Sequence, residues 1–398
     1  MSMQVIVPRI RGFICLNANP LGCAVNVQEQ VDLMTRGAPG NGMNHALVIG
    51  SSTGYGLSSL LATVFGYGAR AVSVCWERPA SGTKSASAGW YNLAAAHRLA
   101  RAAGRPITTI NGDAFGDEIK QQAIAALKDR KAKLDCIVYS LASPKRVDPR
   151  SGETYWSTLK PIGQAYNIKS INLTTDQLTT VDLSPATDDE IQSTRKVMGG
   201  EDWELWMRAL IDADLIAPAC RTVAYSYVGP ELTYPIYRSG TIGKAKEHLE
   251  ETAQTLDRTM RERFGGGAYV SINKALVTQA SSAIPVVPLY ISILYKVMKA
   301  KGTHEGTAAQ ILRMFEDHLR PGRTPVLDAA GRIRLDDREL APDVQSAALA
   351  LWEQVTTENL FTLTDYAGFK QEFRSLFGFD IPGIDYAQPV ETEASLDG

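Results

Sequence analysis

One stretch of the chain, YRSGTIGKAK at residues 237–246, combines a phenol with two amines. Tyr237 opens the stretch, and Lys244 and Lys246 follow it. A nearby ammonium group would favour the phenolate and lower the pKa of Tyr237 toward neutral pH, which suits a proton donor. The same ammonium could instead hold the ribose hydroxyls of a nucleotide cofactor. The competing interpretation is a surface helix with solvated lysines, because GKAKEHLEE is strongly charged.

The spacing does not decide which lysine reaches the phenol. On a continuous helix, the segment from Tyr237 to Lys246 would turn about 900° and rise about 13 Å, so that the two side chains would face opposite ways. Lys244 would return to the face of Tyr237, but two turns away. Two glycines inside the stretch disfavour an unbroken helix. We therefore expect Tyr237 in a loop before a helix, with either lysine able to reach back.

A second stretch, GSSTGYG at residues 50–56, has the composition of a phosphate-binding loop. It follows an apolar run, HALVIG, that predicts a buried parallel strand, and it leads into a segment with helical spacing of apolar residues. Glycines let a pyrophosphate approach the backbone, and the first N–H groups of the helix are free to bind that anion. Glycines also cluster in ordinary turns, but strand, loop and helix stand here in the required order. We therefore expect a dinucleotide at Gly50, Gly54 and Gly56.

Glu77 ends the next predicted strand, AVSVCWE, 21 residues past Gly56. An acid at this place in a dinucleotide-binding fold bonds the hydroxyl groups of the adenosine ribose, and its charge repels a phosphate there. This favours NADH over NADPH, although the neighbouring Arg78 could soften the preference. The competing interpretation pairs Glu77 with Arg78 or Lys84 at the surface.

Two further pairs of residues follow predicted strands at positions where cofactor loops run. Asp113 and Ala114 follow the third strand, where they would meet adenine. Leu141 and Ala142 follow the fourth strand, on the nicotinamide side. These expectations depend on position in the strand–helix series and on no motif.

Tyr225 and Tyr227 lie two residues apart on the predicted strand TVAYSYVG, so that both side chains point to one face. Tyr227 is nearer to the end of the strand, where ligands gather in doubly wound sheets. We expect Tyr227 to bind the substrate through its hydroxyl. The competing interpretation is a core tyrosine with a single satisfied hydroxyl.

The elements that must position these residues alternate between strand and helix. That order predicts an α/β fold with one doubly wound parallel sheet of the Rossmann type. The expected strands span 45–50, 71–77, 106–113, 134–142, 222–229 and 268–273. The expected helices span 51–69, 87–104, 117–130 and 243–264.

Three segments lie outside this alternation. Near the N-terminus we expect a hairpin from QVIVP and GFICL and a helix from VQEQVDLMTRG. Residues from about 145 to 215 form an aromatic-rich insertion. Helices are expected at 307–319 and 342–355, with a hairpin about Gly331 between them. We favour one elaborated domain, with an extension at 1–40, a dinucleotide-binding and catalytic core at 41–300 and C-terminal helices at 301–398.

The composition argues against several classes of protein. The net charge of −2 leaves no basic footprint for nucleic acid. Five scattered cysteines without a C-x-x-C pair indicate reduced thiols in the cytoplasm, and argue against a disulfide framework or a zinc site. The histidines are also dispersed, which argues against a metal. Residues 275–295 carry no charge, but their polar residues and prolines favour a buried or substrate-lining segment over a membrane span.

The chain resembles the trans-2-enoyl-thioester reductases of the FabV class. It does so in the motifs GSSTGYG, CWERP, SAGWYN, NGDAF, VMGGEDWELW, SYVGPE, YRSGTIGKAKEHLE, SINKALVTQASSAIPVVPLY and KGTHEG. The resemblance runs from CLNANPLGC to GFDIPGIDY, nearly the whole chain. It implies a monomer with a Rossmann core related to the short-chain dehydrogenases, and NADH as the cofactor.

The family pattern of a tyrosine, eight residues and a lysine falls on Tyr237 and Lys246. The resemblance therefore implies that Tyr237 donates a proton and that Lys246 binds the cofactor, while Lys244 could assist. Tyr227 matches the substrate-binding tyrosine. The residues that match cofactor contacts are Gly50, Ser51, Ser52, Thr53, Gly54, Tyr55, Trp76, Glu77, Asp113, Ala114, Leu141, Ala142, Leu276, Val277 and Thr278. One departure is Trp76 after Cys75, where an aromatic pair is usual, and it could alter the packing against adenine.

The implied reaction reduces the trans-2 double bond of an enoyl thioester, either enoyl-CoA or enoyl-acyl carrier protein, to the saturated acyl thioester in fatty acid synthesis. NADH would give a hydride to the β-carbon, and phenols at Tyr237 and Tyr227 would stabilise the enolate oxygen. Tyr237 would then supply the proton, and the apolar run 276–295 would line the acyl channel. The basic residues that could meet the carrier are Lys145, Arg146, Lys160, Lys296, Lys299 and Lys301.

Two other functions stay open at this point. A carbonyl reductase of the short-chain-dehydrogenase type would use the same tyrosine–lysine pair with a serine nearby, and Ser226 is available. A dinucleotide-sensing protein would bind NADH and turn over no enoyl thioester.

Overall fold

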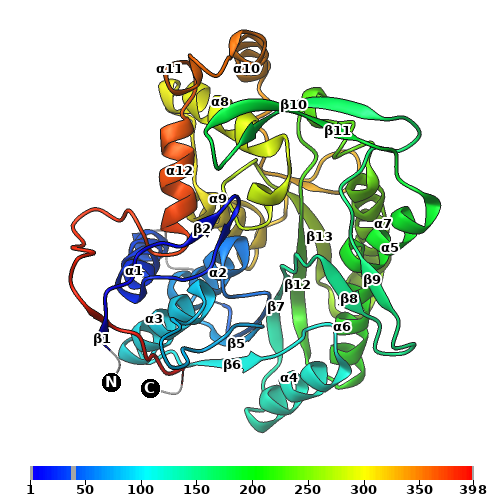
Figure 1. Ribbon diagram of the computed structural model, residues 1–398. Helices are drawn as coiled ribbons and strands as arrows, with labels where there is room; N and C mark the ends of the chain where they lie inside the picture. The colour runs from blue at the N-terminus through cyan, green and yellow to red at the C-terminus, as the bar shows by residue number, and fades with distance from the viewer. Residues whose placement is uncertain (1–2, 37–41, 397–398) are drawn as a thin grey trace.

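The computed structural model describes residues 3–36 and 42–396, so residues 1–2 and 37–40 of the expected extension lie outside it. The described part has a central seven-stranded sheet in which all neighbouring strands are parallel (Figure 1). Across the sheet the strands are β14 (Ile333–Arg334), β13 (Gly267–Ile272), β12 (Ile216–Ser226), β7 (Leu134–Tyr139), β4 (His45–Ile49), β5 (Arg70–Cys75) and β6 (Ile107–Asn111). The doubly wound Rossmann fold is therefore confirmed, and each expected core strand is present.

Helices cover both faces of this sheet, because successive side chains of a strand point to opposite faces. In β4, Ala46 and Val48 join one apolar cluster, whereas Leu47 and Ile49 join another. The first cluster includes side chains of α1 (Pro20–Arg36), α2 (Gly54–Leu61) and α3 (Ala88–Ala102). The second includes side chains of α4 (Asp117–Asp129), α6 (Glu201–Asp212) and α7 (Thr241–Phe264). Burial on both sides explains why the core strands appear in the sequence as continuous apolar runs.

The helices of the core lie close to their expected ranges. α2 continues as a π-helical segment, η1 (Ala62–Gly66), so that the pair covers most of the helix expected at 51–69. α7 begins at Thr241, and Tyr237 lies in the turns between the short helix η2 (Glu231–Thr233) and α7. The expectation that Tyr237 precedes its helix is therefore confirmed.

The N-terminal hairpin is shorter than expected and in a different place. It consists of β2 (Ile10–Arg11) and β3 (Ile14–Cys15), and residues 4–8 are not part of it. β1 (Met3–Gln4) instead pairs with β15 (Val390–Glu391), close to the other end of the chain. The physical reason is that an exposed backbone edge can pair with any strand that tertiary packing brings near. The expected helix is confirmed, and as α1 it begins earlier, at Pro20.

The insertion adds two hairpins and two helices beside the sheet. The hairpins are β8 (Lys145–Val147) with β9 (Thr154–Trp156), and β10 (Tyr166–Asn172) with β11 (Gln177–Leu183). The first helix, α5 (Asp188–Met198), begins with a capping box between Thr187 and Glu190 and packs on α7. The second helix, α6, is tied to α4 by a buried salt bridge between Lys120 and Asp202.

The uncharged segment 275–295 folds into the protein. It contains a short 3-10 helix, η3 (Ser281–Ala283), and most of α8 (Val287–Ala300), whose side chains are buried on nearly every side. α8 packs against β10, α10 (Pro342–Gln354) and α12 (Tyr366–Ser375), at the top of Figure 1. Within residues 3–36 and 42–396, none of the helices has the length and apolar character needed to cross a membrane. The prediction of a buried segment is confirmed.

The expected C-terminal helices are present, but the prediction of a hairpin between them is wrong. α9 (Thr307–Met314) continues as a π-helical segment, η4 (Phe315–Leu319), and the short α11 (Leu360–Leu363) follows α10. The chain does turn at residues 328–332, but the residues after the turn form β14, which joins the central sheet parallel to β13. Ile333 and Leu335 are fully buried there, whereas Val326 is 72 % exposed. Burial of the apolar residues against the sheet thus outweighs pairing with the preceding strand candidate.

Candidate active site

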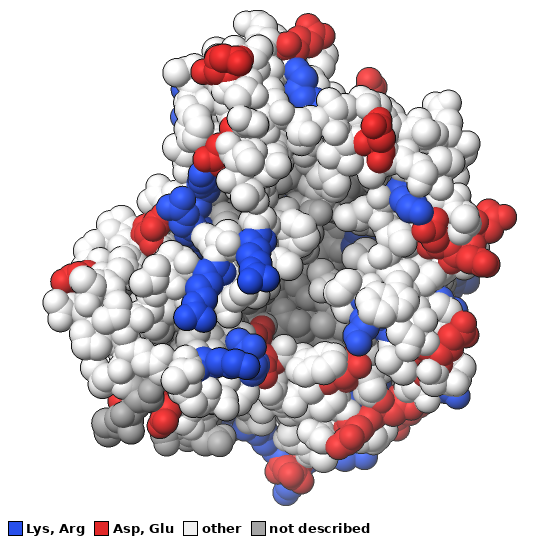
Figure 2. Space-filling view, viewed as in Figure 1, with Lys and Arg blue, Asp and Glu red and all other residues white. Residues whose placement is uncertain are grey.

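A cleft with a volume of about 970 Å³ opens where β4, β5, β6 and β7 end. This is the edge of a doubly wound sheet at which ligands bind. Side chains of α1, of segment 277–280 and of α12 close the other sides of the cleft. The space-filling view shows the molecule hollowed at its centre, with lysine and arginine side chains on the rim (Figure 2).

Glycines shape the loop between β4 and α2. Gly50 has a φ of +81°, and a Cβ atom there would overlap the main-chain oxygen of Ser140. Gly56 packs so closely on Gly50 that a side chain at Gly56 would overlap the main-chain oxygen of Gly50. Thr53 precedes α2 without a side-chain cap, which leaves the first N–H groups of the helix free to bind an anion. The loop therefore has the form that a pyrophosphate requires.

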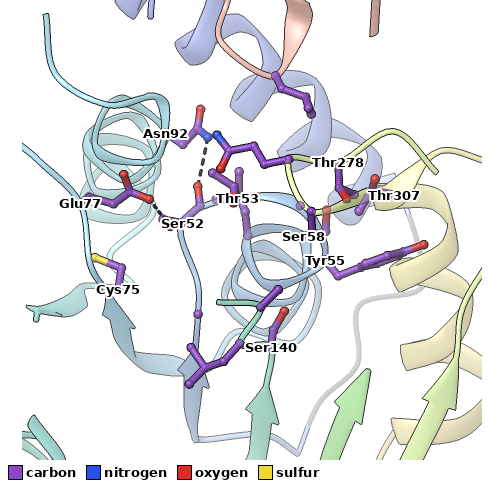
Figure 3. Close-up of a pocket in the computed structure, with 18 of the residues that line it drawn as sticks. Ser52, Thr53, Tyr55, Ser58, Cys75, Glu77, Asn92, Ser140, Thr278 and Thr307 are labelled. Carbon is purple, nitrogen blue, oxygen red and sulfur yellow. Dashed lines mark hydrogen bonds between the residues drawn. The ribbon is translucent and has the colours of Figure 1, made fainter. Parts of the chain in front are cut away.

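Glu77 is held at the wall of the cleft by uncharged groups (Figure 3). The hydroxyl of Ser52 donates to Oε1 of Glu77 over 2.6 Å, and Nδ2 of Asn92 donates to the main-chain oxygen of Ser52 over 3.0 Å. The side-chain amide of Asn111 binds both the main-chain N–H and the main-chain oxygen of Glu77. In the described part of the chain, Glu77 forms no salt bridge, so the surface pairing with Arg78 or Lys84 does not occur there.

Most of the other residues expected at the cofactor line the same cleft. They are Gly50, Ser52, Thr53, Gly54, Tyr55, Trp76, Asp113, Ala114, Leu141, Ala142, Val277 and Thr278. Trp76 lines the cleft and is 69 % exposed, so its ring is accessible to a bound molecule. Ser51 does not reach the cleft, because its buried hydroxyl bonds to Ser73 and to the main-chain oxygen of Val74. Gly56 is also behind the wall, where it allows the close packing described above.

A smaller cavity, of about 190 Å³, adjoins the cleft. The two share the residues Tyr55, Ser140, Leu141, Ala142, Thr278 and Ala280. Tyr227, Tyr237, Lys246 and Leu276 all line this smaller cavity. The fold thus brings together the end of β12, the turn before α7, α7 itself and the segment after β13.

Tyr227 and Tyr237 meet edge to face in this cavity. Their ring centroids are 4.8 Å apart, and the ring planes are inclined by 88°. The hydroxyl of Tyr227 donates to Oε1 of Glu339 over 2.9 Å. The hydroxyl of Tyr237 has no hydrogen-bond partner among the described residues, and so it is available to a molecule bound in the cavity.

The two lysines on α7 point to different places. Nζ of Lys244 lies 2.8 Å from Oε2 of Glu247 at the surface. Nζ of Lys246 points inward and donates to the main-chain oxygen of Tyr225 over 3.0 Å. Burial lowers the pKa of Lys246 to about 8, although the charge of Glu250 opposes that effect. The structure therefore places Lys246, and not Lys244, in the cavity with Tyr237.

The pKa of Tyr237 differs from the expectation that a lysine would lower it. Burial raises the pKa of Tyr237 above its ordinary value. The reason is that the ammonium of Lys246 bonds to a carbonyl group and not to the phenol, so it does not offset the loss of solvation. The phenol therefore stays protonated at neutral pH.

Three buried residues beside the tyrosine pair were not predicted from the sequence, and one of them, Lys274, lines the small cavity. They are Lys274, Tyr290 and Glu339. Glu339 lies in the stretch RLDDRELAPD, whose charge is typical of a solvated surface, and nothing in the local pattern indicates burial. Asn92 was also missed, although it belongs to the motif SAGWYN, which the resemblance had already singled out.

Three family models match successive parts of the chain. Residues 5–82 match the NAD(P)H binding domain of trans-2-enoyl-CoA reductase. Residues 84–320, more than half of the chain, match the trans-2-enoyl-CoA reductase catalytic region. Residues 327–390 match the enoyl reductase FAD binding domain.

Individual proteins resemble the chain over nearly its whole length. The enoyl-acyl-carrier-protein reductase (NADH) of Pseudoalteromonas atlantica is 53 % identical over 99 % of this chain and 100 % of its own. The enzyme of the same description from Opitutus terrae is 51 % identical over 98 % of both chains. The crystal structure of Treponema denticola trans-2-enoyl-CoA reductase in complex with NAD superposes with a TM-score of 0.93, at 46 % identity over 98 % of both chains.

Proposed function

The chain belongs to the trans-2-enoyl-CoA reductase family, and we propose that Tyr237, Tyr227 and Lys246 carry out its reaction. The protein is an NADH-dependent oxidoreductase that reduces the trans-2 double bond of an enoyl thioester to the saturated acyl thioester. The observation that supports these roles most directly is the hydroxyl of Tyr237, which lines the cavity beside Tyr227 and has no hydrogen-bond partner within residues 3–36 and 42–396.

The large cleft fits NADH in shape and in chemistry. Gly50 and Gly54 both have positive φ angles, which shape the loop that leads into α2, where free N–H groups suit a pyrophosphate. Glu77, oriented by Ser52, suits the ribose hydroxyls of adenosine and would repel a phosphate there. When bound, NADH supplies a hydride for the β-carbon of the substrate. The proposed contacts are Gly50, Ser52, Thr53, Gly54, Tyr55, Trp76, Glu77, Asp113, Ala114, Leu141, Ala142, Lys246, Leu276, Val277 and Thr278.

A flavin, which the name of the third family model implies, does not fit residues 327–390. The aromatic side chains of this segment, among them Trp352, Tyr366 and Phe369, are packed in a hydrophobic cluster with α8. In the described part of the segment, the residues that reach the cleft are Glu372, Ser375 and Leu376. No step of the reaction is assigned to a flavin.

Tyr237 is proposed to donate the proton that completes the reduction. Addition at the β-carbon leaves negative charge on the thioester oxygen, and a phenol stabilises that enolate more than it stabilises the neutral substrate. Burial raises the pKa of Tyr237, so the phenol enters the reaction protonated at neutral pH. Its proton then passes to the enolate, and a phenolate forms transiently in the cavity that Lys246 also lines.

Lys246 and Tyr227 are proposed to orient the reactants. One N–H of the Lys246 ammonium bonds to the main-chain oxygen of Tyr225, which leaves two for the cofactor ribose. The charge of the ammonium also favours the transient phenolate. Tyr227 is proposed to contact the substrate with its ring and phenol oxygen, since it stands against Tyr237 in the same cavity while its one hydroxyl proton is directed at Glu339.

The acyl chain is proposed to lie against the apolar wall of the small cavity. Leu276 and Ile284 line this wall from the segment between β13 and α8, and Val287 lines it from the start of α8. Met198 lines it from the end of α5. Apolar side chains of this kind suit a hydrocarbon chain. The size of these side chains is expected to limit the chain length that the enzyme accepts.

The carrier of the acyl group is coenzyme A or acyl carrier protein, and both present negative charge. Four of the basic residues considered for the carrier already form salt bridges with acidic side chains: Arg146, Lys160, Lys299 and Lys301. Lys145 lines the cleft, and its ammonium lies over the ring of Trp156. We therefore propose Lys145 as the contact for the phosphate groups of coenzyme A or for the acidic carrier protein.

The test is the loss of NADH absorbance with crotonyl-CoA compared with acetoacetyl-CoA. We expect crotonyl-CoA to be reduced and acetoacetyl-CoA to be left unchanged. Preference for acetoacetyl-CoA would instead indicate a carbonyl reductase that uses Ser226, which lines the same cavity. Binding of NADH without turnover of either thioester would indicate dinucleotide sensing.

A further inference from the structure

A buried carboxylate lies directly behind the tyrosine pair. Glu339 is fully buried, and it reaches the cavity region from the segment that follows β14. Its Oε1 accepts hydrogen bonds from the hydroxyls of Tyr227, over 2.9 Å, and Tyr290, over 2.8 Å. Its Oε2 accepts a bond from the main-chain N–H of Ala275 over 2.7 Å. Three donors on one carboxylate hold it in a single orientation, and each bond to an ionised acceptor is strong.

A second buried charge, that of Lys274, lies near Glu339 and influences it, although the two side chains form no salt bridge among the described residues. Lys274 is also buried, and its Nζ donates to the main-chain oxygen of Ala275 over 3.0 Å. Burial raises the pKa of Glu339, and the charge of Lys274 opposes that rise. Burial likewise lowers the pKa of Lys274 to about 8, against the effect of Glu339. Burying a charge is costly unless it is compensated, and here three hydrogen bonds to Glu339 and the nearby charge of Lys274 provide that compensation.

The bond to Glu339 decides where the hydroxyl proton of Tyr227 points. A tyrosine has one hydroxyl proton, and that of Tyr227 is directed at Oε1 of Glu339. Tyr237, by contrast, has no partner among the described residues and can give its proton to a bound molecule. The two phenols that line the cavity therefore differ in their hydrogen bonding, although their rings are in contact.

We propose that Glu339 is a positioning residue that acts through Tyr227, by holding its phenol against Tyr237 and by directing its hydroxyl proton. The inference depends on the proposed function, in which Tyr227 contacts the substrate beside Tyr237. Glu339 itself lines neither of the two cavities described, so it does not touch the substrate. Through its hydrogen bond with Tyr227, Glu339 links the segment after β14 to the small cavity.

The substitution Glu339→Gln tests this role with little change in volume. An amide cannot satisfy all three donors, because its NH₂ group must face either Ala275 or the two tyrosine hydroxyls. The neutral bonds that remain are about half as strong as those to a carboxylate. We expect kcat with crotonyl-CoA to fall between about tenfold and about 100-fold, as for a misplaced catalytic group. The dissociation constant for NADH should change by less than about twofold, because Glu339 is not at the cleft.

A double-mutant cycle separates positioning from general destabilisation. The four proteins are the wild type, E339Q, Y227F and the double variant, each assayed for kcat and KM by loss of NADH absorbance at enzyme concentrations raised until the rate is measurable. If Glu339 acts through the Tyr227 hydroxyl, E339Q lowers kcat in the wild type and has no further effect in Y227F. An equal loss in both backgrounds, or no loss in the wild type, would overturn the proposal.

Asp176→Asn provides a matched control. Asp176 accepts a hydrogen bond from the hydroxyl of Tyr366 over 2.8 Å and pairs with Lys370, and it lines neither cavity. The kcat of the D176N variant should stay within about twofold of the wild-type value. If Y227F has no measurable rate, the cycle is carried out on the melting temperature. E339Q should then lower the melting temperature of the wild type by more than it lowers that of Y227F. Equal destabilisation would refute the coupling.

The outcome for Glu339 can be distinguished from failure of the proposed function. A wild type that reduces no crotonyl-CoA, or a fully active Y237F variant, would refute the proposed function and with it this inference. An active wild type with an inactive Y237F variant but no coupling between residues 227 and 339 would refute the role of Glu339 alone.

Discussion

The ammonium nitrogen of Lys246 lies 3.0 Å from the main-chain oxygen of Tyr225, in the cavity that Tyr237 also lines. This bond fixes a side chain of α7 to the end of β12, at the edge of the sheet where ligands bind. It also explains why the amine does not contact the phenol directly. Lys246 is therefore placed to act on a bound cofactor and on charge that develops in the cavity.

Affinity for NADH is expected to fall as the pH rises through about 8. Burial lowers the pKa of Lys246 to about 8, so its ammonium carries its charge below that pH and loses it above. NADH binding is measured by fluorescence titration across this range for the wild type, K246M and K244M. K246M should bind weakly at every pH, and K244M should behave like the wild type, because Lys244 pairs with Glu247 at the surface. A wild-type affinity that is constant with pH would contradict the role of Lys246.

Replacing Tyr237 with phenylalanine should lower kcat with crotonyl-CoA by about 100-fold or more, the range for loss of a general acid. NADH binding should be nearly unchanged, because the substitution removes one hydroxyl from the smaller cavity. Single-turnover and steady-state rates, with a separate NADH titration, measure both effects. The control is Tyr234→Phe, in the same turn, since Tyr234 lines neither of the two cavities described. Full activity of Y237F would refute its assignment as proton donor.

Replacing Glu77 with alanine should weaken NADH binding by about tenfold, the cost of a lost charge-assisted hydrogen bond. The preference for NADH over NADPH should narrow at the same time, because the carboxylate no longer repels a ribose phosphate. The ratio of kcat/KM values for the two cofactors measures this change. Glu118→Ala, on the exposed first turn of α4, is the control. An unchanged ratio in E77A would place the adenosine ribose elsewhere.

Replacing Asp202 with alanine should destabilise the fold by about 3 to 5 kcal/mol, the cost of leaving a buried charge unpaired. Nζ of Lys120 lies 2.8 Å from Oδ1 of Asp202, and both side chains are at most 3 % exposed. Chemical denaturation measures the free energy of unfolding. Glu204→Ala, which removes an exposed pair with Arg208 on the same helix, should cost no more than about 1 kcal/mol. A similarly small effect in D202A would show that the buried pair does not anchor α6 to α4.

Local sequence patterns predicted the core of the fold well. Continuous apolar runs located the strands of the parallel sheet, because such strands are buried on both faces. The errors occur where pairing depends on distant segments. β1 pairs with β15, and β14 joins the edge of the sheet, although the local pattern around Gly331 favours a hairpin.

The glycine loop and Glu77 were located from the sequence because they depend on neighbours in the chain. The strand, the turn and the helix that follow one another already define where a pyrophosphate and a ribose would lie. The choice between Lys244 and Lys246 did not follow from spacing, since the direction of each side chain depends on where α7 packs. The family resemblance favoured Lys246, and the structure places its amine in the cavity.

By itself, the sequence determined the parallel sheet and the dinucleotide loop. It also showed that the tyrosine–lysine stretch matches the family pattern of a tyrosine, eight residues and a lysine. Hydrophobic period, glycine and short motifs are properties of adjacent residues, so no knowledge of the whole fold is needed to recognise them. Only the tertiary structure decided the environment of each group. Burial raises the pKa of Tyr237 where a lysine was expected to lower it. Glu339, 112 residues from Tyr227, accepts a hydrogen bond from the hydroxyl of Tyr227. Solvation and hydrogen-bond partners depend on which distant segments pack together, and that is settled when the chain folds.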